Sequence, residues 1–188
     1  MGCPNPQPVA ADNSGVTQQI LFTDGSVDPL SKVGYGAYLI TTAPLPSRDE
    51  LMGRVVSKRF VDTTSTRLEL QTLLWAINEL KNTGQLHQQH DHLTIYTDCQ
   101  TTINLPARRQ RLEQNNYCSK KNVPLKNGDL YQQLFLQFDS INLELIKVRG
   151  HHAAKHHQHI DQIFTLVDRC ARETLRSNPP PKQLHHPT

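Results

Sequence analysis

Two carboxylates stand out in the sequence because each directly follows a short apolar run. Asp24 follows residues 20–23 and Asp98 follows residues 93–97. Runs of this length and composition are typical of buried strands. If the two strands are parallel neighbours, both side chains emerge at one edge of the sheet, where open α/β sheets bind their ligands.

Two ionised carboxylates a few ångströms apart repel each other, so folding alone does not favour such a pair. A divalent cation removes the repulsion, and Mg²⁺ and Mn²⁺ are hard cations that take oxygen ligands. Either residue alone is also explained as a turn or cap residue, since Asp24-Gly25 is a common turn sequence. The repetition of the pattern favours a metal site for the pair.

Glu69 is a third candidate, near the start of a helix that apolar spacing predicts over residues 66–82. Thr66 and Glu69 also fit a capping box, and an acid in the first turn suits the helix dipole. The spacing alone leaves both interpretations open.

Asp168 is a fourth candidate, at the edge of the apolar stripe of a helix predicted over residues 160–176. Its structural alternative is an exposed ion pair with Arg172 one turn later. Asp161 competes with it, although an acid in the first turn of a helix has a simpler structural explanation.

The elements that must position these acids follow from the hydrophobic periodicity. Strands are predicted over 19–23, 35–42, 53–61, 92–97 and 142–148, and helices over 66–82, 128–139 and 160–176. Short links between the first three strands indicate an antiparallel meander, followed by right-handed crossovers. The expected fold is α/β, a mixed five-stranded sheet with its first three strands antiparallel and helices packed on it.

The composition suits one domain, since 36% of the 188 residues are hydrophobic and 20% are charged. We expect a flexible N-terminal arm over 1–17, the domain over 18–176, and a Pro-rich disordered tail over 177–188. No apolar run approaches the ~20 residues of a membrane-spanning helix, and the first residues lack the apolar segment of a signal peptide. Four scattered cysteines without a CxxC motif fit reduced thiols, so a cytoplasmic protein is expected.

Positive charge is concentrated in residues 105–126, although the net charge of the chain is only +3. A solvated surface explains such a run simply. The alternative is nucleic-acid binding, because Lys and Arg neutralise phosphates and release their counterions. The basic residues are Arg108, Arg109, Arg111, Lys120, Lys121 and Lys126, against the single acid Glu113.

Short motifs along the chain together resemble a known family. They are Thr23-Asp24-Gly25-Ser26, Gly34-Tyr35-Gly36-Ala37, Arg67-Leu68-Glu69-Leu70, Tyr96-Thr97-Asp98-Cys99-Gln100, Lys126-Asn127-Gly128-Asp129-Leu130, Val148-Arg149-Gly150-His151, and Val167-Asp168-Arg169-Cys170-Ala171-Arg172. In this order and on these elements the chain resembles the type 1 ribonuclease H (ribonuclease HI-like) family from about residue 19 to residue 175. Each fragment alone is common, so the specificity lies in their order.

The resemblance implies the ribonuclease H fold and an endonuclease that hydrolyses the RNA strand of RNA–DNA hybrids, leaving 5′-phosphate products. Carried over by position, the ligands of two Mg²⁺ ions, with Mn²⁺ as a substitute, would be Asp24, Glu69, Asp98 and Asp168. Asp168 is preferred to Asp161 because residues 169–172 continue the family pattern. The two ions would lie roughly 3.5–4 Å apart astride the scissile phosphate. His151 matches a mobile-loop histidine that assists proton movement or product release, with the adjacent His152 as the alternative.

The resemblance also implies how the substrate is held. Thr64, Ser65 and a helix N-terminus would bind a phosphate of the DNA strand, and Gln100 matches a minor-groove contact. The basic segment would reach toward the DNA strand, and RNA would be distinguished by its 2′-OH groups. Two alternatives keep the fold: a weak or inactive duplex-binding domain, and a nuclease for another duplex such as double-stranded RNA. A monomer without membrane contact is expected.

Overall fold

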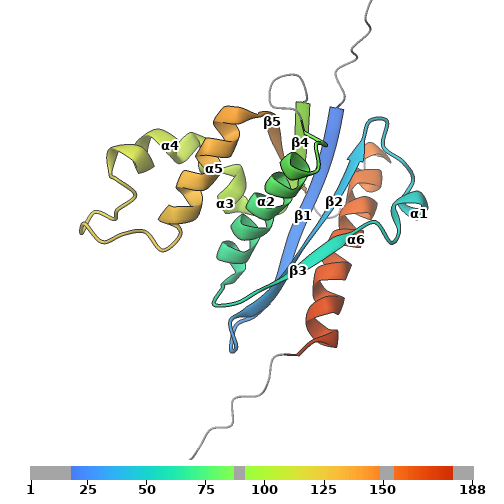
Figure 1. Ribbon diagram of the computed structural model, residues 1–188, viewed down its shortest axis with the longest axis horizontal. Helices are drawn as coiled ribbons and strands as arrows, with labels where there is room; N and C mark the ends of the chain where they lie inside the picture. The colour runs from blue at the N-terminus through green and yellow to red at the C-terminus, as the bar shows by residue number, and fades with distance from the viewer. Residues whose placement is uncertain (1–17, 87–91, 149–154, 180–188) are drawn as a thin grey trace, which may run out of the picture.

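The computed structural model describes residues 18–86, 92–148 and 155–179, with side chains in the last range from residue 158 onward. A five-stranded sheet in the order β3-β2-β1-β4-β5 forms its centre (Figure 1). The strands are β1 (Gln18–Asp28), β2 (Val33–Thr42), β3 (Val56–Phe60), β4 (His92–Thr97) and β5 (Asn142–Lys147). The helices are α1 (Arg48–Leu51), α2 (Ser65–Asn82), α3 (Gln100–Ile103), α4 (Leu105–Gln114), α5 (Gly128–Ser140) and α6 (Lys155–Ser177).

The sheet has the predicted mixed topology. β1 pairs antiparallel with β2, and β2 pairs antiparallel with β3. β1 also pairs parallel with β4, which pairs parallel with β5. The prediction of an α/β fold with a meander followed by crossovers is therefore confirmed.

Alternation along β1 separates two cores on the two faces of the sheet. Leu21 belongs to the core beneath α2 and α5, whereas Ile20 and Phe22 belong to the core beneath α6. This is the two-residue period of a strand whose faces are both covered. In Figure 1, α2 crosses in front of the sheet and α6 passes behind β2 and β3.

Glycines on β1 and β2 allow α2 to lie very close to the sheet. A Cβ atom added at Gly36 would lie 1.9 Å from Oγ1 of Thr72, and one at Gly25 would lie 2.8 Å from Cγ of Leu68. Real Cβ atoms do not approach neighbours this closely, so the two positions accept no larger residue without displacing α2. The same turn of α2 carries Glu69, so this packing also sets the position of that acid.

The Asp24-Gly25 sequence is not a turn. β1 continues through both residues, which pair with Ala37 and Gly36 of β2, and the hairpin reverses only after Asp28. There the Asp28 carboxylate accepts a hydrogen bond from the Ser31 hydroxyl at 2.6 Å. The predicted strand end at Asp24 was wrong because pairing with β2 extends the strand beyond its apolar run.

The ends of two other elements also differ from prediction. α2 begins at Ser65, and the Thr64 hydroxyl caps it by accepting from the Arg67 N–H at 3.4 Å, so a capping box starting at Thr66 is wrong. α6 begins at Lys155, earlier than residue 160, and extends to Ser177, the first residue of the predicted tail. β3 is shorter than the predicted 53–61. The predicted arm, and the tail from residue 180, lie outside the described residues.

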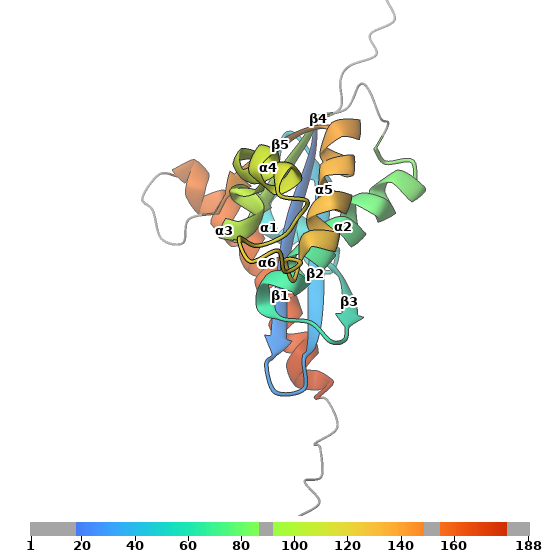
Figure 2. The same cartoon turned by 90° about the vertical axis from the view of Figure 1, so that its left-hand side faces the viewer.

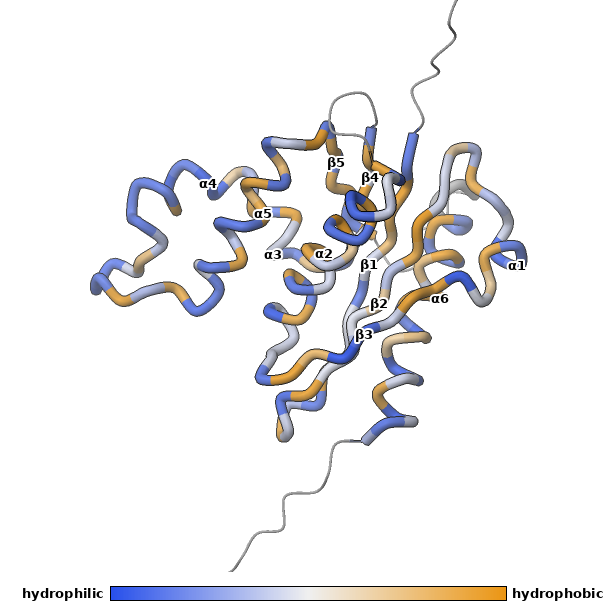
Figure 3. Tube along the Cα trace, viewed as in Figure 1, coloured by the Kyte–Doolittle hydropathy of each residue, from blue (hydrophilic) through white to orange (hydrophobic). Residues whose placement is uncertain are grey.

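Residues 99–126 hold two helices, α3 and α4, for which the periodicity made no prediction. Only Leu105 and Leu112 of α4 are buried, so its apolar stripe is too sparse to reveal a helix. α4 projects beyond the sheet (Figure 1), so it lies in front of the strands when the molecule is viewed from that side (Figure 2), and it is dominated by hydrophilic residues (Figure 3). Among the described helices, none combines the length and the apolar character needed to cross a membrane.

Candidate active site

The register of β1 and β4 places Asp24 and Asp98 at equivalent positions. The last parallel pair is Phe22 with Tyr96, whose rings stack with centroids 5.0 Å apart. Each Asp lies two residues further along its chain, on the face of the sheet that α6 covers. The predicted juxtaposition of these acids thus holds, although for β1 it occurs within the strand and not at its end.

Asp168 approaches the same place from α6. Its carboxyl group lies beside that of Asp24 and raises the pKa of Asp24, and its charge also raises the pKa of Asp98. Asp168 also accepts from the Arg172 guanidinium at 2.8 Å. The ion pair with Arg172 is therefore present, and the same Asp168 side chain also lies beside Asp24. The two interpretations of Asp168 do not exclude each other.

Asp161 takes a different position. It lines a hollow of about 360 Å³ together with Asp98, Asp168 and Arg172, with Val148, Phe164 and Thr165 as the other lining residues. Asp168 is the α6 acid that lies beside Asp24. The structure thus brings Asp168 to the β1 carboxylate, while Asp161 lies at the wall of the hollow beside it.

Glu69 reaches the group from α2. Its Oε1 accepts a hydrogen bond from the Ser65 hydroxyl at 3.3 Å, and the nearby Cys99 thiol opposes the rise in the pKa of Glu69. The charge of Asp98 acts on Glu69, which places the α2 acid within electrostatic reach of the β4 acid. Acids from four separate stretches of the chain therefore converge at one edge of the sheet.

The convergence changes how these groups hold protons. Burial, followed by the charge of Asp98, raises the pKa of Asp24 from 3.8 to about 8. Burial also raises the pKa values of Glu69 and Asp98, and neighbouring carboxylates add to both shifts. Lys147 and Arg172 act in the opposite direction on Asp98. The four carboxyl groups thus repel one another when ionised, and a bound cation would relieve this repulsion.

The four carboxylates suit a hard divalent cation that takes its remaining ligands from water and from a substrate. In the described part of the chain, no three His, Cys, Asp or Glu side chains converge tightly enough to hold a metal ion on their own. Mg²⁺ is seldom held by an all-protein cage, because it keeps several waters and takes one or two carboxylates plus substrate phosphate oxygens. Asp24, Asp98, Asp168 and Glu69 offer that kind of incomplete oxygen site.

A second pocket, of about 500 Å³, lies at the N-terminus of α2. Arg67 forms a two-point ion pair with Asp129 of α5 at 3.0 and 2.7 Å, which fixes one wall of the pocket.

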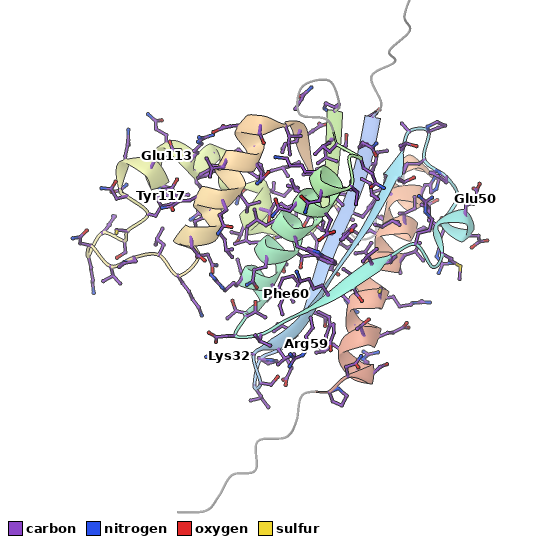
Figure 4. The ribbon with its side chains drawn as sticks, in the orientation of Figure 1. Lys32, Glu50, Arg59, Phe60, Glu113 and Tyr117 are labelled. Carbon is purple, nitrogen blue, oxygen red and sulfur yellow. The ribbon has the colours of Figure 1, made fainter. Side chains whose placement is uncertain are left out.

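The two residues predicted to bind a phosphate take different positions. Thr64 lines this pocket, whereas the exposed Ser65 hydroxyl donates a hydrogen bond to Glu69. The lining residues are Lys32, Asp62, Thr63, Thr64, Arg67, Lys126 and Asp129. Figure 4 labels Lys32 beside the β1–β2 turn. Lys32 pairs with Asp62 at 3.7 Å and Arg67 pairs with Asp129, so the lining keeps one excess positive charge, from Lys126, beside the N-terminus of α2.

The basic segment divides into cations with intramolecular partners and cations that are exposed. Arg109 binds Asp139 at 2.5 and 2.8 Å and Glu113 at 2.7 Å, and its guanidinium lies 4.9 Å from the Phe135 ring centroid. Arg108 lies over the ring of Tyr131 at 5.7 Å. Both therefore attach α4 to α5.

The remaining cations of the segment are exposed, with Lys126 at the pocket of α2 and the others on the projecting part that also carries Glu113 and Tyr117 (Figure 4). We call the projecting three the exposed basic group: Arg111, Lys120 and Lys121.

Gln100 begins α3, directly after Asp98 and Cys99. The predicted His151 and its alternative His152 lie outside the described residues. Sequence reasoning missed Lys32, Arg67 and Lys147, which lie beside the pocket or the carboxylates. Arg67 was visible only as part of a motif, and its partner is 62 residues away in sequence, so no local signal could identify the pair.

Similarity to known proteins extends over most of the chain. The sequence model of the RNase H family matches residues 16–173. The chain belongs to the RNase H family. Ribonuclease H of Moorella thermoacetica is 31% identical over 137 residues, covering 70% of this chain and 78% of that protein. Ribonuclease H of Rickettsia bellii is 24% identical, covering 86% of this chain and 96% of that protein.

A shorter match is to ribonuclease H of Rickettsia massiliae, which is 30% identical over 92 residues, and there the chain spans 56% of the relative's length. All three of these relatives carry the name ribonuclease H.

Two solved structures share the fold. LC9-RNase H1, a type 1 RNase H with the type 2 active-site motif, has a TM-score of 0.61 at 16% identity, covering 86% of this chain and 74% of that one. The foamy viral protease-reverse transcriptase in complex with dsDNA has a TM-score of 0.56 at 12% identity, covering 84% of this chain and 95% of that one. At these identities the likeness supports the mixed five-stranded α/β fold.

Proposed function

We propose that this protein is an endonuclease that hydrolyses the RNA strand of RNA–DNA hybrids with two divalent ions, Mg²⁺ or Mn²⁺. The observation that carries the proposal is the meeting of Asp24, Asp98 and Asp168 at the edge of the sheet, where burial and mutual repulsion raise the pKa of Asp24 to about 8. Such repulsion is costly in a folded protein and is relieved by cations.

Asp24, Glu69, Asp98 and Asp168 would hold the ions. When bound, two such ions lower the pKa of an attacking water and stabilise the leaving 3′ oxygen, so that the product carries a 5′ phosphate. The protein's own part is to keep four carboxylates at fixed positions. The hydrogen bond from Ser65 orients Glu69, and the ion pair with Arg172 orients Asp168.

The pocket at the start of α2 would bind a phosphate of the DNA strand through Thr64 and the helix N–H groups, with Lys126 supplying the excess positive charge. Ser65 would support this end of the helix, and Gln100 would contact the minor groove. The exposed basic group would contact further phosphates, whereas Arg108 and Arg109 would contribute mainly by attaching α4 to α5.

The proposal also includes a role for one histidine, the oligomeric state and the location in the cell. His151 would assist proton movement or product release. The protein would act as a monomer in the cytoplasm, in keeping with the free thiols of Cys99, Cys118 and Cys170.

A cleavage assay on four matched duplexes tests the proposal: an RNA–DNA hybrid, a DNA duplex, an RNA duplex and a DNA duplex with a single ribonucleotide. With Mg²⁺ or Mn²⁺ we expect cleavage of the hybrid RNA strand to 5′-phosphate ends, and none in EDTA. Intact hybrid with both metals would refute the enzyme proposal. Preferential cleavage of the RNA duplex would favour the alternative substrate.

Two variants connect the activity to the carboxylates. Asp24→Asn and Asp98→Asn should each lower cleavage by more than the ~10–100-fold that loss of an outer partner of a metal site costs. The matched control is Asp49→Asn, the same chemical change at a carboxylate whose side chain is 87% exposed on α1. Activity retained in Asp24→Asn would contradict the assignment.

A further inference from the structure

Lys147 is a cation at the site that neither the motifs nor the proposed chemistry uses. It is the last residue of β5 and pairs in register with Thr97, the residue before Asp98. Its side chain is exposed, and its ammonium group donates a hydrogen bond to Oε1 of Gln100. The end of β5 is thus joined to the start of α3 by a side-chain contact between residues 47 apart in sequence.

The amide of Gln100 is held at both ends. Its oxygen accepts from Lys147, and its Nε2 donates to Oδ1 of Asn104 at 2.9 Å. The two ends of an amide differ in chemistry, so these partners define which side presents the acceptor and which presents the donor. Each end keeps one free hydrogen-bonding position, since the oxygen has a second lone pair and the nitrogen a second hydrogen.

The charge of Lys147 also acts at the catalytic edge. The nearby ammonium opposes the rise in the pKa of Asp98 that burial and Asp168 cause. Lys147 therefore lies close to both the Asp98 carboxylate and the Gln100 amide, at the boundary between the carboxylates and the surface where the substrate would lie.

We propose that Lys147 is a positioning residue that orients the Gln100 amide for the minor groove of a bound hybrid duplex. This inference rests on the proposed function, because it assumes that the duplex lies across α3. An amide that is already oriented binds more tightly than a freely rotating one, because it loses less side-chain conformational entropy when the duplex binds. Lys147 acts through Gln100, so its contribution should vanish when the amide is absent.

A double-mutant cycle tests this dependence. The variants are Lys147→Met, Gln100→Ala and the double variant, with binding of a short fluorescein-labelled RNA–DNA hybrid measured in EDTA so that no cleavage occurs. We expect Lys147→Met to weaken binding roughly 3- to 10-fold in the wild-type background and to have no further effect in Gln100→Ala. Lys147→Arg, which keeps the charge and a donor, should restore most of the affinity.

Controls separate positioning from charge and from folding. Lys58→Met removes the same charge from β3, where the ammonium lies 5.4 Å from the Trp75 ring centroid, and should leave hybrid affinity within about twofold. The urea midpoint of Lys147→Met should match wild type.

An equal loss of affinity in both backgrounds would show an independent phosphate contact and overturn the proposal, as would an unchanged affinity in Lys147→Met. A wild-type protein that does not bind the hybrid overturns it as well. Binding without cleavage in Mg²⁺ removes only the nuclease function, so the two failures are distinguishable.

Discussion

Replacing Asp24 by Asn should stabilise the metal-free protein while abolishing cleavage. The pKa of Asp24 is raised from 3.8 to about 8 in the folded protein, so the folded state binds the proton more tightly than the unfolded state. Stability is then highest below pH 3.8 and falls as the pH rises toward 8, by about 1.36 kcal/mol per pH unit. Asn imitates the neutral acid at every pH and keeps the hydrogen bond that the Gly25 N–H donates at 2.7 Å.

The gain in the free energy of unfolding grows with the number of pH units above 3.8, the ordinary pKa of an Asp side chain. At pH 5 the Asn variant should be more stable by roughly 2 kcal/mol, and at pH 7 by about 4 kcal/mol. For a chain of this size the second value corresponds to a rise in Tm on the order of 10 °C. Urea unfolding followed by circular dichroism, in EDTA at the two pH values, measures both differences.

The dependence on pH is the decisive result. A gain of the same size at pH 5 and pH 7 would show that Asn improves packing and that the carboxylate is not forced to hold its proton. A loss of stability at both would refute the assigned repulsion. Asp49→Asn, a change at an exposed carboxylate, should alter neither value appreciably.

Two other predictions concern packing and charge. Gly36→Ala should destabilise the protein by about 3 kcal/mol in urea unfolding, because the new Cβ meets Oγ1 of Thr72 at 1.9 Å; an unchanged midpoint would contradict the close packing of α2. Neutralising the exposed basic group should lower the slope of log K against log salt for hybrid binding by about 2–3, whereas Arg109→Ala, at a residue already paired with Asp139, should change it less. An unaltered slope in the triple variant would rule out phosphate contacts by these residues.

The relation of sequence to site is clearest at Asp24. The apolar run before it predicted a buried strand, which is confirmed, and the condition for its meeting with Asp98, a parallel pairing of the two strands, is met by β1 and β4. Its Asp-Gly sequence also predicted a turn, which was wrong, because ten pairs with β2 continue the strand to Asp28. Local sequence describes what a segment prefers, and the partner strand decided where this one stops.

In α4, by contrast, the local sequence indicated neither the helix nor the partners of its arginines. Its two buried leucines give too weak a stripe to predict a helix, and its arginines were interpreted together as a surface for phosphates. In the structure Arg109 is occupied by Asp139, 30 residues away, and Arg108 lies over Tyr131. Which cations stay exposed depends on how α4 packs against α5, and no local pattern contains that information.

By itself, the sequence predicted the order of the five strands and of α2, α5 and α6, and it singled out the acids that follow two of the strands, since these follow from hydrophobic periodicity and from residue types a few positions apart. Only the tertiary structure decided that Asp168 lies beside Asp24, that Arg67 and Asp129 form one wall of the pocket at the start of α2, and that Lys147 holds Gln100. Those contacts join segments separated by 47 to 144 residues, and their geometry exists only once both faces of the sheet are packed.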